Sequence, residues 1–266
     1  MGLAYERLGS GPTLVLLHGV GHRRQAWDAV LDRLAPHRDV IVVDLPGHGE
    51  SPPLDTGLPI LDALLGPVRG LLDDLAVGRP HMAGNSLGGR LALEAGVAGW
   101  AASVTGLSPA GFWRNGREAA WARGTFKVMQ AAGSRLRRFA PALSRHTAGR
   151  ALVYGAIVSR PSRMTAEQAL GDMTAFLAAH DALEVILAEL TPFTGQVPDG
   201  IPVSIAWGTR DRLLRPPQVL VARARLPKAR IRPLPGCGHV PMTDDPALVA
   251  DVLLQGSGRA LTGQAA

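Results

Sequence analysis

Short apolar segments, most of them ending in glycine, alternate along most of this chain with longer segments of helical character. Segments of this length and composition are typical of buried strands. Strict alternation of strand and helix predicts a mostly parallel sheet with helices on both faces, because each parallel connection has to cross back over the sheet. The predicted strands are residues 13–19, 40–47, 80–86, 103–109, 201–208 and 230–236, and the predicted helices lie near residues 25–36, 59–76, 87–99, 216–226 and 244–255.

The alternation stops between residues 111 and 196, where alanine, arginine, leucine and methionine dominate and no strand pattern appears. We therefore predict a helical insertion over 111–196 in an α/β core formed by residues 1–110 and 197–255. The remaining residues, 256–266, are small and polar, and we predict a flexible tail. Hydrophobic residues make up 46% of the chain and charged residues 19%, which is ample for one large core with an inserted piece.

Positive charge is concentrated in the predicted insertion. Residues 114–163 contain ten arginines and one lysine, and Glu118 is their only acidic residue. A charge run of this kind is typical of a solvated helical face, and the alternative is a basic rim that attracts an anionic substrate or touches a membrane surface. The formal net charge of +6 comes without a stacking platform or a helix-turn-helix pattern, so we predict no nucleic-acid partner.

The single cysteine, Cys237, excludes an internal disulfide framework and leaves too few thiolates for a zinc or iron–sulfur site. The first residues, MGLAYERLGSGP, lack the apolar run of a secretion signal, and no segment approaches the roughly 18 uninterrupted apolar residues of a membrane span. We therefore expect a cytoplasmic protein without stable membrane insertion. The sequence carries no indication of oligomeric state.

Residues 84–88 read GNSLG, a GxSxG pattern between a predicted strand and a predicted helix. In such an elbow the serine occupies a strained turn that lifts its hydroxyl away from the sheet, and small flanking residues let the strand and helix approach closely. We predict Ser86 as a nucleophile. A similar pattern surrounds Ser108, but Pro109 follows it and has no backbone N–H to offer an oxyanion.

A serine hydroxyl is a poor nucleophile until a base takes its proton, so a histidine must reach it. Of the eight histidines, His239 is the best candidate, because it follows the last predicted strand, lies in the glycine-rich loop PGCGHVPM and precedes the last predicted helix. His18 also ends a strand, but the glycine after it predicts a structural turn. His48 lies in another strand-end loop, PGHGES.

The base needs a buried acid that fixes its tautomer and stabilises the imidazolium. Asp211, in WGTRDRLL, lies just beyond a predicted strand and is placed for this role. Its rival Asp44 is followed by the turn LPGHG, and we predict that it caps that loop. Ser86, Asp211 and His239 follow one another in the order typical of hydrolases with this elbow.

Two backbone N–H groups, those of Leu87 and Val20, are predicted to stabilise an oxyanion. Val20 belongs to the loop HGVG after a buried strand, and the glycines of this loop permit a sharp bend. Its side chain is then free to contact the substrate, and Trp113 and Val240 are the other predicted substrate contacts. Cys237 is rejected as a nucleophile because it shares the loop of the base and lacks an elbow.

Taken together, these motifs closely resemble the α/β-hydrolase superfamily, over residues 3–255 apart from the insertion. The resemblance implies a mostly parallel sheet of about seven or eight strands, a helical cap over the active site between the sixth and seventh strands, a small-molecule substrate and no cofactor. The motifs that carry it are HGVGHRRQAW (18–27), DLPGHGES (44–51), GNSLGG (84–89), WGTRD (207–211) and GCGHVP (236–241).

Two departures from the pattern narrow these expectations. Only 17 residues precede His18, which leaves room for one short strand over residues 3–8, so the usual antiparallel opening of the sheet is expected to be curtailed. A serine at position 86 argues against the dehalogenase and epoxide-hydrolase branches, which have aspartate there.

Three functions are compatible with these residues. The first is hydrolysis of an ester, lactone or thioester of an anionic or apolar acyl group by Ser86 through an acyl-enzyme. The second is cleavage of a carbon–carbon bond in a vinylogous diketone by the same residues, since GNSLGG is similar to both kinds of hydrolase. PGHGES favours the esterase or lactonase. The third is a ligand receptor whose turnover is incidental, which the complete Ser, Asp and His set disfavours.

Overall fold

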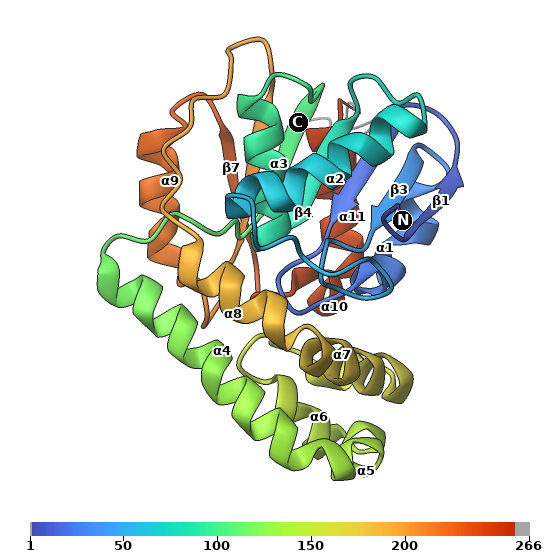
Figure 1. Cartoon of the computed structure of the whole chain (residues 1–266), viewed down its shortest axis with the longest axis vertical. Coiled ribbons are helices and arrows are strands. Elements are labelled where there is room, and N and C mark those ends of the chain that lie inside the picture. Colours follow the sequence, from blue (N-terminus) through green and yellow to red (C-terminus); the bar gives the residue numbers. More distant parts are fainter. Residues whose placement is uncertain (1, 259–266) are drawn as a thin grey trace, which may run out of the picture.

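The computed structural model describes residues 2–258 of the 266-residue chain. Within this range seven strands form one sheet in the order β1-β3-β2-β4-β5-β6-β7, and helices cover both of its faces (Figure 1). Every neighbouring pair is parallel except β1 with β3. The predicted α/β fold with a mostly parallel sheet is confirmed. The strands are β1 (Tyr5–Gly9), β2 (Thr13–Leu17), β3 (Asp39–Val43), β4 (His81–Asn85), β5 (Ser103–Leu107), β6 (Val203–Gly208) and β7 (Arg230–Leu234).

The hydrophobicity of each strand matches its place in the sheet. All residues of the inner strands β3 and β5 are buried, because helices cover both sides of a parallel sheet. The edge strand β1 is mostly exposed and carries charged side chains. One of them, Arg7, forms an ion pair of 2.8 Å with Asp39 on β3. A charged edge opposes the addition of a further strand.

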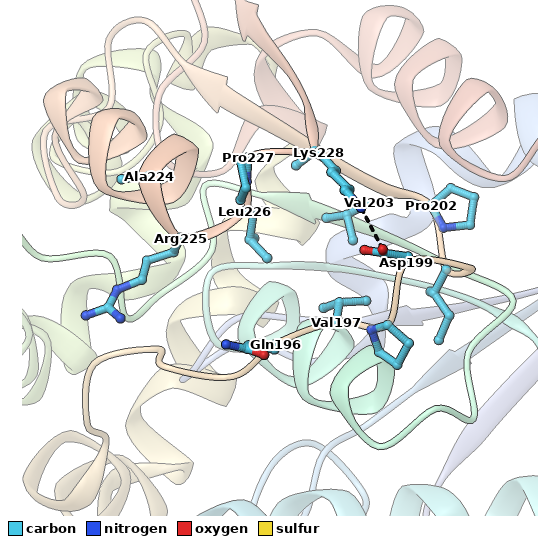
Figure 2. A pocket seen from close by; sticks show the side chains of 13 residues that line it. Gln196, Val197, Asp199, Pro202, Val203, Ala224, Arg225, Leu226, Pro227 and Lys228 are labelled. Carbon is cyan, nitrogen blue, oxygen red and sulfur yellow. Dashed lines mark ion pairs between the residues drawn. The ribbon is translucent and has the colours of Figure 1, made fainter.

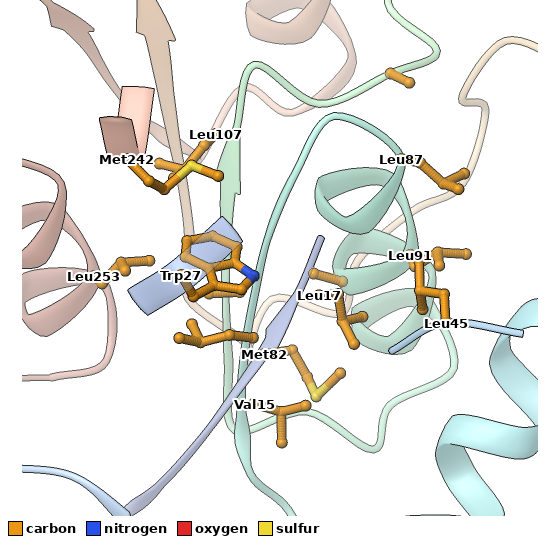
Figure 3. Close-up of a cluster of buried hydrophobic side chains, with 14 of the residues drawn as sticks. Val15, Leu17, Trp27, Leu45, Met82, Leu87, Leu91, Leu107, Met242 and Leu253 are labelled. Atoms are coloured by element: carbon orange, nitrogen blue, oxygen red, sulfur yellow. The ribbon is translucent and has the colours of Figure 1, made fainter. Parts of the chain in front are cut away.

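Two helical layers enclose the sheet, with α2 and α3 on one face and α1 and α11 on the other (Figure 1). Trp27 is fully buried at the start of α1, in the same apolar cluster as Met242 and Leu253 (Figure 3). The helices of the core are η1 (Arg24–Trp27), α1 (Asp28–Leu34), α2 (Ile60–Asp74), α3 (Leu87–Val97), η4 (Pro216–Gln218), α9 (Val219–Arg225), α10 (Pro241–Asp244) and α11 (Pro246–Gly256).

A run of helices interrupts the core and gathers at one end of the molecule (Figure 1). The predicted position between the sixth and seventh strands is wrong by one: the run lies between β5 and β6, because the antiparallel opening of the sheet consists of β1 alone. No helix within residues 2–258 is long and apolar enough to cross a membrane. The inserted helices are α4 (Gly116–Leu136), η2 (Arg137–Phe139), α5 (Ala140–Arg145), α6 (Thr147–Tyr154), η3 (Pro161–Arg163), α7 (Ala166–Ala178) and α8 (His180–Glu189).

The expected flexible tail over 256–266 needs a correction at its start. Gly256 is the last residue of α11 and is buried. Ser257 is also buried, and its hydroxyl accepts a hydrogen bond of 2.9 Å from Arg38 Nε. The chain is therefore tied to the core through Ser257, and residues 259–266 lie outside the described part of the chain.

Candidate active site

Ser86 occupies a sharp turn between β4 and α3. Its φ of 54° lies in the left-handed region, which costs a residue with a side chain about 1–3 kcal/mol. Flanking glycines make the turn possible: a Cβ on Gly88 would lie 2.0 Å from the carbonyl oxygen of Leu17, and a Cβ on Gly84 would lie 2.2 Å from the carbonyl carbon of Gly88. The GxSxG pattern therefore forms the strained strand–turn–helix elbow that the sequence predicts.

Substitution of Gly88 tests this packing. We expect Gly88→Ala to lower the free energy of unfolding by about 1–3 kcal/mol, because the added methyl meets the backbone oxygen of Leu17 rather than a movable side chain. Gly70→Ala in α2 is the matched control, since nothing lies within 4 Å of a Cβ there, and it should stabilise the protein by about 0.5–1 kcal/mol. Urea unfolding of both variants measures the difference, and equal effects would contradict the packing argument.

The loop after β2 lies against the elbow. A Cβ on Gly19 would lie 3.3 Å from the Cβ of Ser86. Within residues 2–258, neither the backbone N–H of Val20 nor that of Leu87 donates a hydrogen bond. Leu87 is the first residue of α3, where backbone N–H groups have no acceptor inside the helix. The N–H groups of Leu87 and Val20 are therefore free to donate, as the predicted oxyanion site requires.

His18 fixes this loop in place. In the assigned tautomer its Nδ1–H donates to the carbonyl oxygen of Gly19 at 2.8 Å, and its Nε2 accepts from the backbone N–H of Leu45 at 3.0 Å. Burial lowers the pKa of His18 well below its usual value, so the ring stays neutral and keeps both bonds. His18 is a structural residue of the turn, as its sequence context predicts.

His239 and Asp211 form a buried pair. Nδ1 of His239 lies 2.8 Å from Oδ2 of Asp211, and both residues are almost completely buried. The other carboxylate oxygen, Oδ1, accepts the backbone N–H groups of Leu213 at 2.9 Å and Leu214 at 2.8 Å. With these bonds the carboxylate has one orientation, and it presents Oδ2 to the imidazole.

Two polar residues that the sequence did not single out position the loop of His239. Asn85, next to Ser86, donates from Nδ2 to the carbonyl oxygen of His239 at 2.9 Å. The buried carboxylate of Asp244 accepts the backbone N–H of Gly238 at 2.7 Å and that of Arg160 in the insertion at 2.6 Å. Asn85 and His239 are 154 residues apart in the sequence, and Arg160 and Asp244 are 84 apart. No local pattern could therefore have revealed these contacts.

The structure thus brings the elbow, the loop of Val20 and the loop of His239 to one region, at the carboxyl ends of the parallel strands. The Ser86 hydroxyl makes no hydrogen bond to any residue in the described range, and the bond between this hydroxyl and the imidazole of His239 stays a prediction. Catalytic hydrogen bonds are often long before substrate binds.

The rival residues have other roles. Asp44 is fully buried, pairs with Arg24 and accepts the backbone N–H of Glu50 at 3.0 Å, so it caps its loop as predicted. Burial lowers the pKa of His48 to about 4. The pKa of Cys237 is raised to about 11 by burial and by nearby carboxylates, which leaves this thiol protonated and unsuited to nucleophilic attack.

An apolar pocket of about 310 Å³ lies between the loop of Val20 and the inserted helices. Val20 lines it, whereas Trp113 and Val240 are not among its lining residues. Contact of these three residues with substrate stays a prediction. The sequence did not single out His22, which lines the pocket and whose pKa is lowered by burial. Other lining residues include Phe126, Met129, Tyr154, Ile157, Asp172, Met173 and Phe176.

A second cavity, of about 420 Å³, shares no lining residue with this pocket, and Figure 2 shows its walls. Its walls are residues 196–199, 201–203 and 224–229, at the amino ends of β6 and β7. The ion pair of 2.6 Å between Lys228 and Asp199 is largely exposed there. Because Ser86, Asp211 and His239 lie beyond the carboxyl ends of their strands, this larger cavity has no part in their chemistry.

Comparison with known proteins identifies the class to which this fold and site belong. Residues 14–252 match the model of the alpha/beta hydrolase family, and the chain belongs to this family. An uncharacterized protein of Mycobacterium tuberculosis (strain ATCC 25618 / H37Rv) is 27% identical over 94% of this chain and 76% of its own.

Two similar proteins have activities in their names. The pimeloyl-[acyl-carrier protein] methyl ester esterase of Aeromonas salmonicida is 39% identical over 35% of this chain and 35% of its own length. A thermophilic esterase from Thermogutta terrifontis has the same fold, with a TM-score of 0.70 and 20% identity over 95% of this chain and 92% of its own.

Proposed function

We propose that the protein is a serine hydrolase that cleaves carboxylic esters, including lactones or thioesters, through an acyl-enzyme. The observation that carries the proposal is the strained turn of Ser86, which packs against the loop of Val20 with its free backbone N–H. Asn85 beside it donates a hydrogen bond to the loop of His239, whose imidazole pairs with Asp211. Nucleophile, base, orienting acid and oxyanion donors are the parts that acyl transfer needs.

In the proposed reaction the Ser86 hydroxyl attacks the carbonyl carbon while Nε2 of His239 takes its proton. The N–H groups of Val20 and Leu87 stabilise the oxyanion. The imidazolium then gives its proton to the departing alcohol, which leaves an acyl group on Ser86. Water, deprotonated by the same imidazole, attacks this acyl group and restores the free enzyme. Asp211 holds the imidazole in place and stabilises its charged form.

The proposed acyl site is the apolar pocket beside Val20. None of its lining residues is an arginine or lysine, which favours an apolar acyl group over the anionic vinylogous diketone of a carbon–carbon bond hydrolase. Its volume of about 310 Å³ matches the lower range of small-molecule pockets. We further propose that the helices over residues 111–196 form a cap that selects the acyl group through this pocket. The names of the esterase relatives support ester hydrolysis as the reaction.

Labelling with a fluorophosphonate and a panel of substrates test the proposal. We expect mass spectrometry to find one phosphonate adduct, on Ser86, and multiple turnover of p-nitrophenyl esters with apolar acyl chains. An adduct on another residue would overturn the assignment of the nucleophile. Turnover of vinylogous diketones without ester hydrolysis would favour the carbon–carbon bond hydrolase, and binding without turnover would favour the receptor.

A further inference from the structure

The inserted helices α4 to α6 expose positive charge, and most acidic residues of the insertion lie on α7 and α8. Residues 119–166 contain nine arginines and lysines and no aspartate or glutamate. Six of the nine are exposed and form no ion pair with a carboxylate of the described residues: Lys127, Arg135, Arg137, Arg138, Arg145 and Arg163. The first five follow one another from α4 to α5. A cluster of cations without paired carboxylates creates a positive potential that attracts anionic partners.

Large apolar side chains are exposed in the same region. Val128 on α4 is 70% exposed and Leu152 on α6 is 71% exposed, the two highest values for large hydrophobic residues within the described range. Val128 and Arg135 are seven residues apart in one helix, which places them on the same side, two turns apart. Cations and apolar tips therefore share one surface, which is typical of helices that lie in a membrane interface.

The apolar pocket opens at this surface. Val128 and Leu152 both line it, and its other end is formed by the loop of Val20 and His22. Since a Cβ added to the neighbouring Gly19 would lie 3.3 Å from the Cβ of Ser86, the pocket leads from the exposed tips toward the proposed nucleophile. A partner that covers the tips also covers the entrance of the pocket.

We propose that Lys127, Val128, Arg135, Arg138 and Leu152, here called the basic-apolar face, dock on the surface of an anionic membrane. The two apolar tips enter the headgroup layer, and the three cations contact lipid phosphates. The pocket entrance then faces the bilayer, so an apolar ester enters without crossing water. This last step rests on the proposed esterase activity, whereas docking does not. Exposed apolar tips at the entrance favour a lipid surface over an acidic protein.

Flotation with vesicles tests the charges. We expect the protein to float with vesicles of phosphatidylcholine and phosphatidylglycerol, to remain behind with phosphatidylcholine alone, and to be released at 1 M salt, where the Debye length is about 3 Å. The triple variant Lys127→Glu, Arg135→Glu, Arg138→Glu should bind at least about tenfold more weakly and hydrolyse a water-soluble short-chain ester at the wild-type rate. The control Arg223→Glu, Arg225→Glu, Arg230→Glu changes the net charge equally on exposed core positions and should bind normally.

A second pair of variants tests the apolar tips. Val128→Asp, Leu152→Asp should weaken binding to the same anionic vesicles severalfold, and Leu220→Asp should leave it unchanged, because Leu220 is 61% exposed on α9 of the core. Equal loss of binding in both triple variants, or no binding to anionic vesicles, would overturn the proposal. Equally tight binding to soluble polyglutamate, unaffected by Val128→Asp, Leu152→Asp, would assign the face to an acidic protein. Vesicle binding without any ester hydrolysis would overturn the esterase and leave docking intact.

Discussion

Ser86→Ala is expected to lower kcat for ester hydrolysis by about 10⁴-fold to 10⁶-fold, with a small rate left above the uncatalysed reaction. The variant removes the atom that forms the acyl-enzyme and leaves the N–H groups of Val20 and Leu87, which still stabilise an oxyanion formed by attacking water. The variant should fold normally, because the hydroxyl makes no hydrogen bond within the described residues and alanine fits the space of serine without a clash. Steady-state kinetics and thermal unfolding of the same preparation measure the two effects.

Ser108→Ala is the matched control for this substitution. Ser108 also follows a strand, is fully buried and has a positive φ of 41°, but the residue after it is a proline. Its variant should keep kcat within about threefold of wild type, since its side chain has no part in acyl transfer. If Ser86→Ala retained more than a tenth of the wild-type kcat, or if Ser108→Ala were the inactive variant, the assignment of the nucleophile would be wrong.

The fold was predictable because its determinants are local. Strands such as β3 and β5 are continuous apolar runs, and turns such as the one at Ser86 have glycines where a Cβ would collide with backbone. The predicted position of the insertion was wrong by one strand. It was counted from the family pattern, whereas this chain opens with β1 alone before the parallel strands. The inserted helices were visible as a gap in the alternation, although their individual limits were not.

Much of the candidate site was also predictable, since Ser86, Val20, Asp211 and His239 each end or follow a strand of a parallel sheet, and such positions share one edge. The contacts that position them were not. Asn85 reaches His239 over 154 residues of sequence, and Asp244 reaches Arg160 over 84. His22 lines a pocket that residues of the distant helix α7 also line. Distances of this kind depend on tertiary packing, which a single sequence does not specify.

Asp211→Asn is expected to lower kcat by about 10³-fold to 10⁴-fold while the protein stays folded. The reason lies in the two backbone N–H groups of Leu213 and Leu214, which donate to Oδ1 of Asp211. An asparagine must keep its carbonyl oxygen at that position, since its NH₂ group there would face two donors. The NH₂ group then points at Nδ1 of His239 and donates to it, which forces the ring proton onto Nε2. An imidazole protonated at Nε2 cannot accept the proton of Ser86.

Asp44→Asn separates this effect from a general loss of a buried carboxylate. Asp44 is also fully buried at the end of a strand, but it pairs with Arg24 rather than with an imidazole, and breaking a buried pair destabilises by about 3 kcal/mol. We expect Asp44→Asn to lower the unfolding temperature and to keep kcat. Asp211→Asn should instead lower kcat and keep the unfolding temperature. For Asp211→Asn, KM should be nearly unchanged, and phosphonate labelling of Ser86 should slow in proportion to kcat. A kcat for Asp211→Asn above a tenth of wild type would show that the pair does not set the tautomer of His239, because a wrong tautomer stops proton transfer in every turnover.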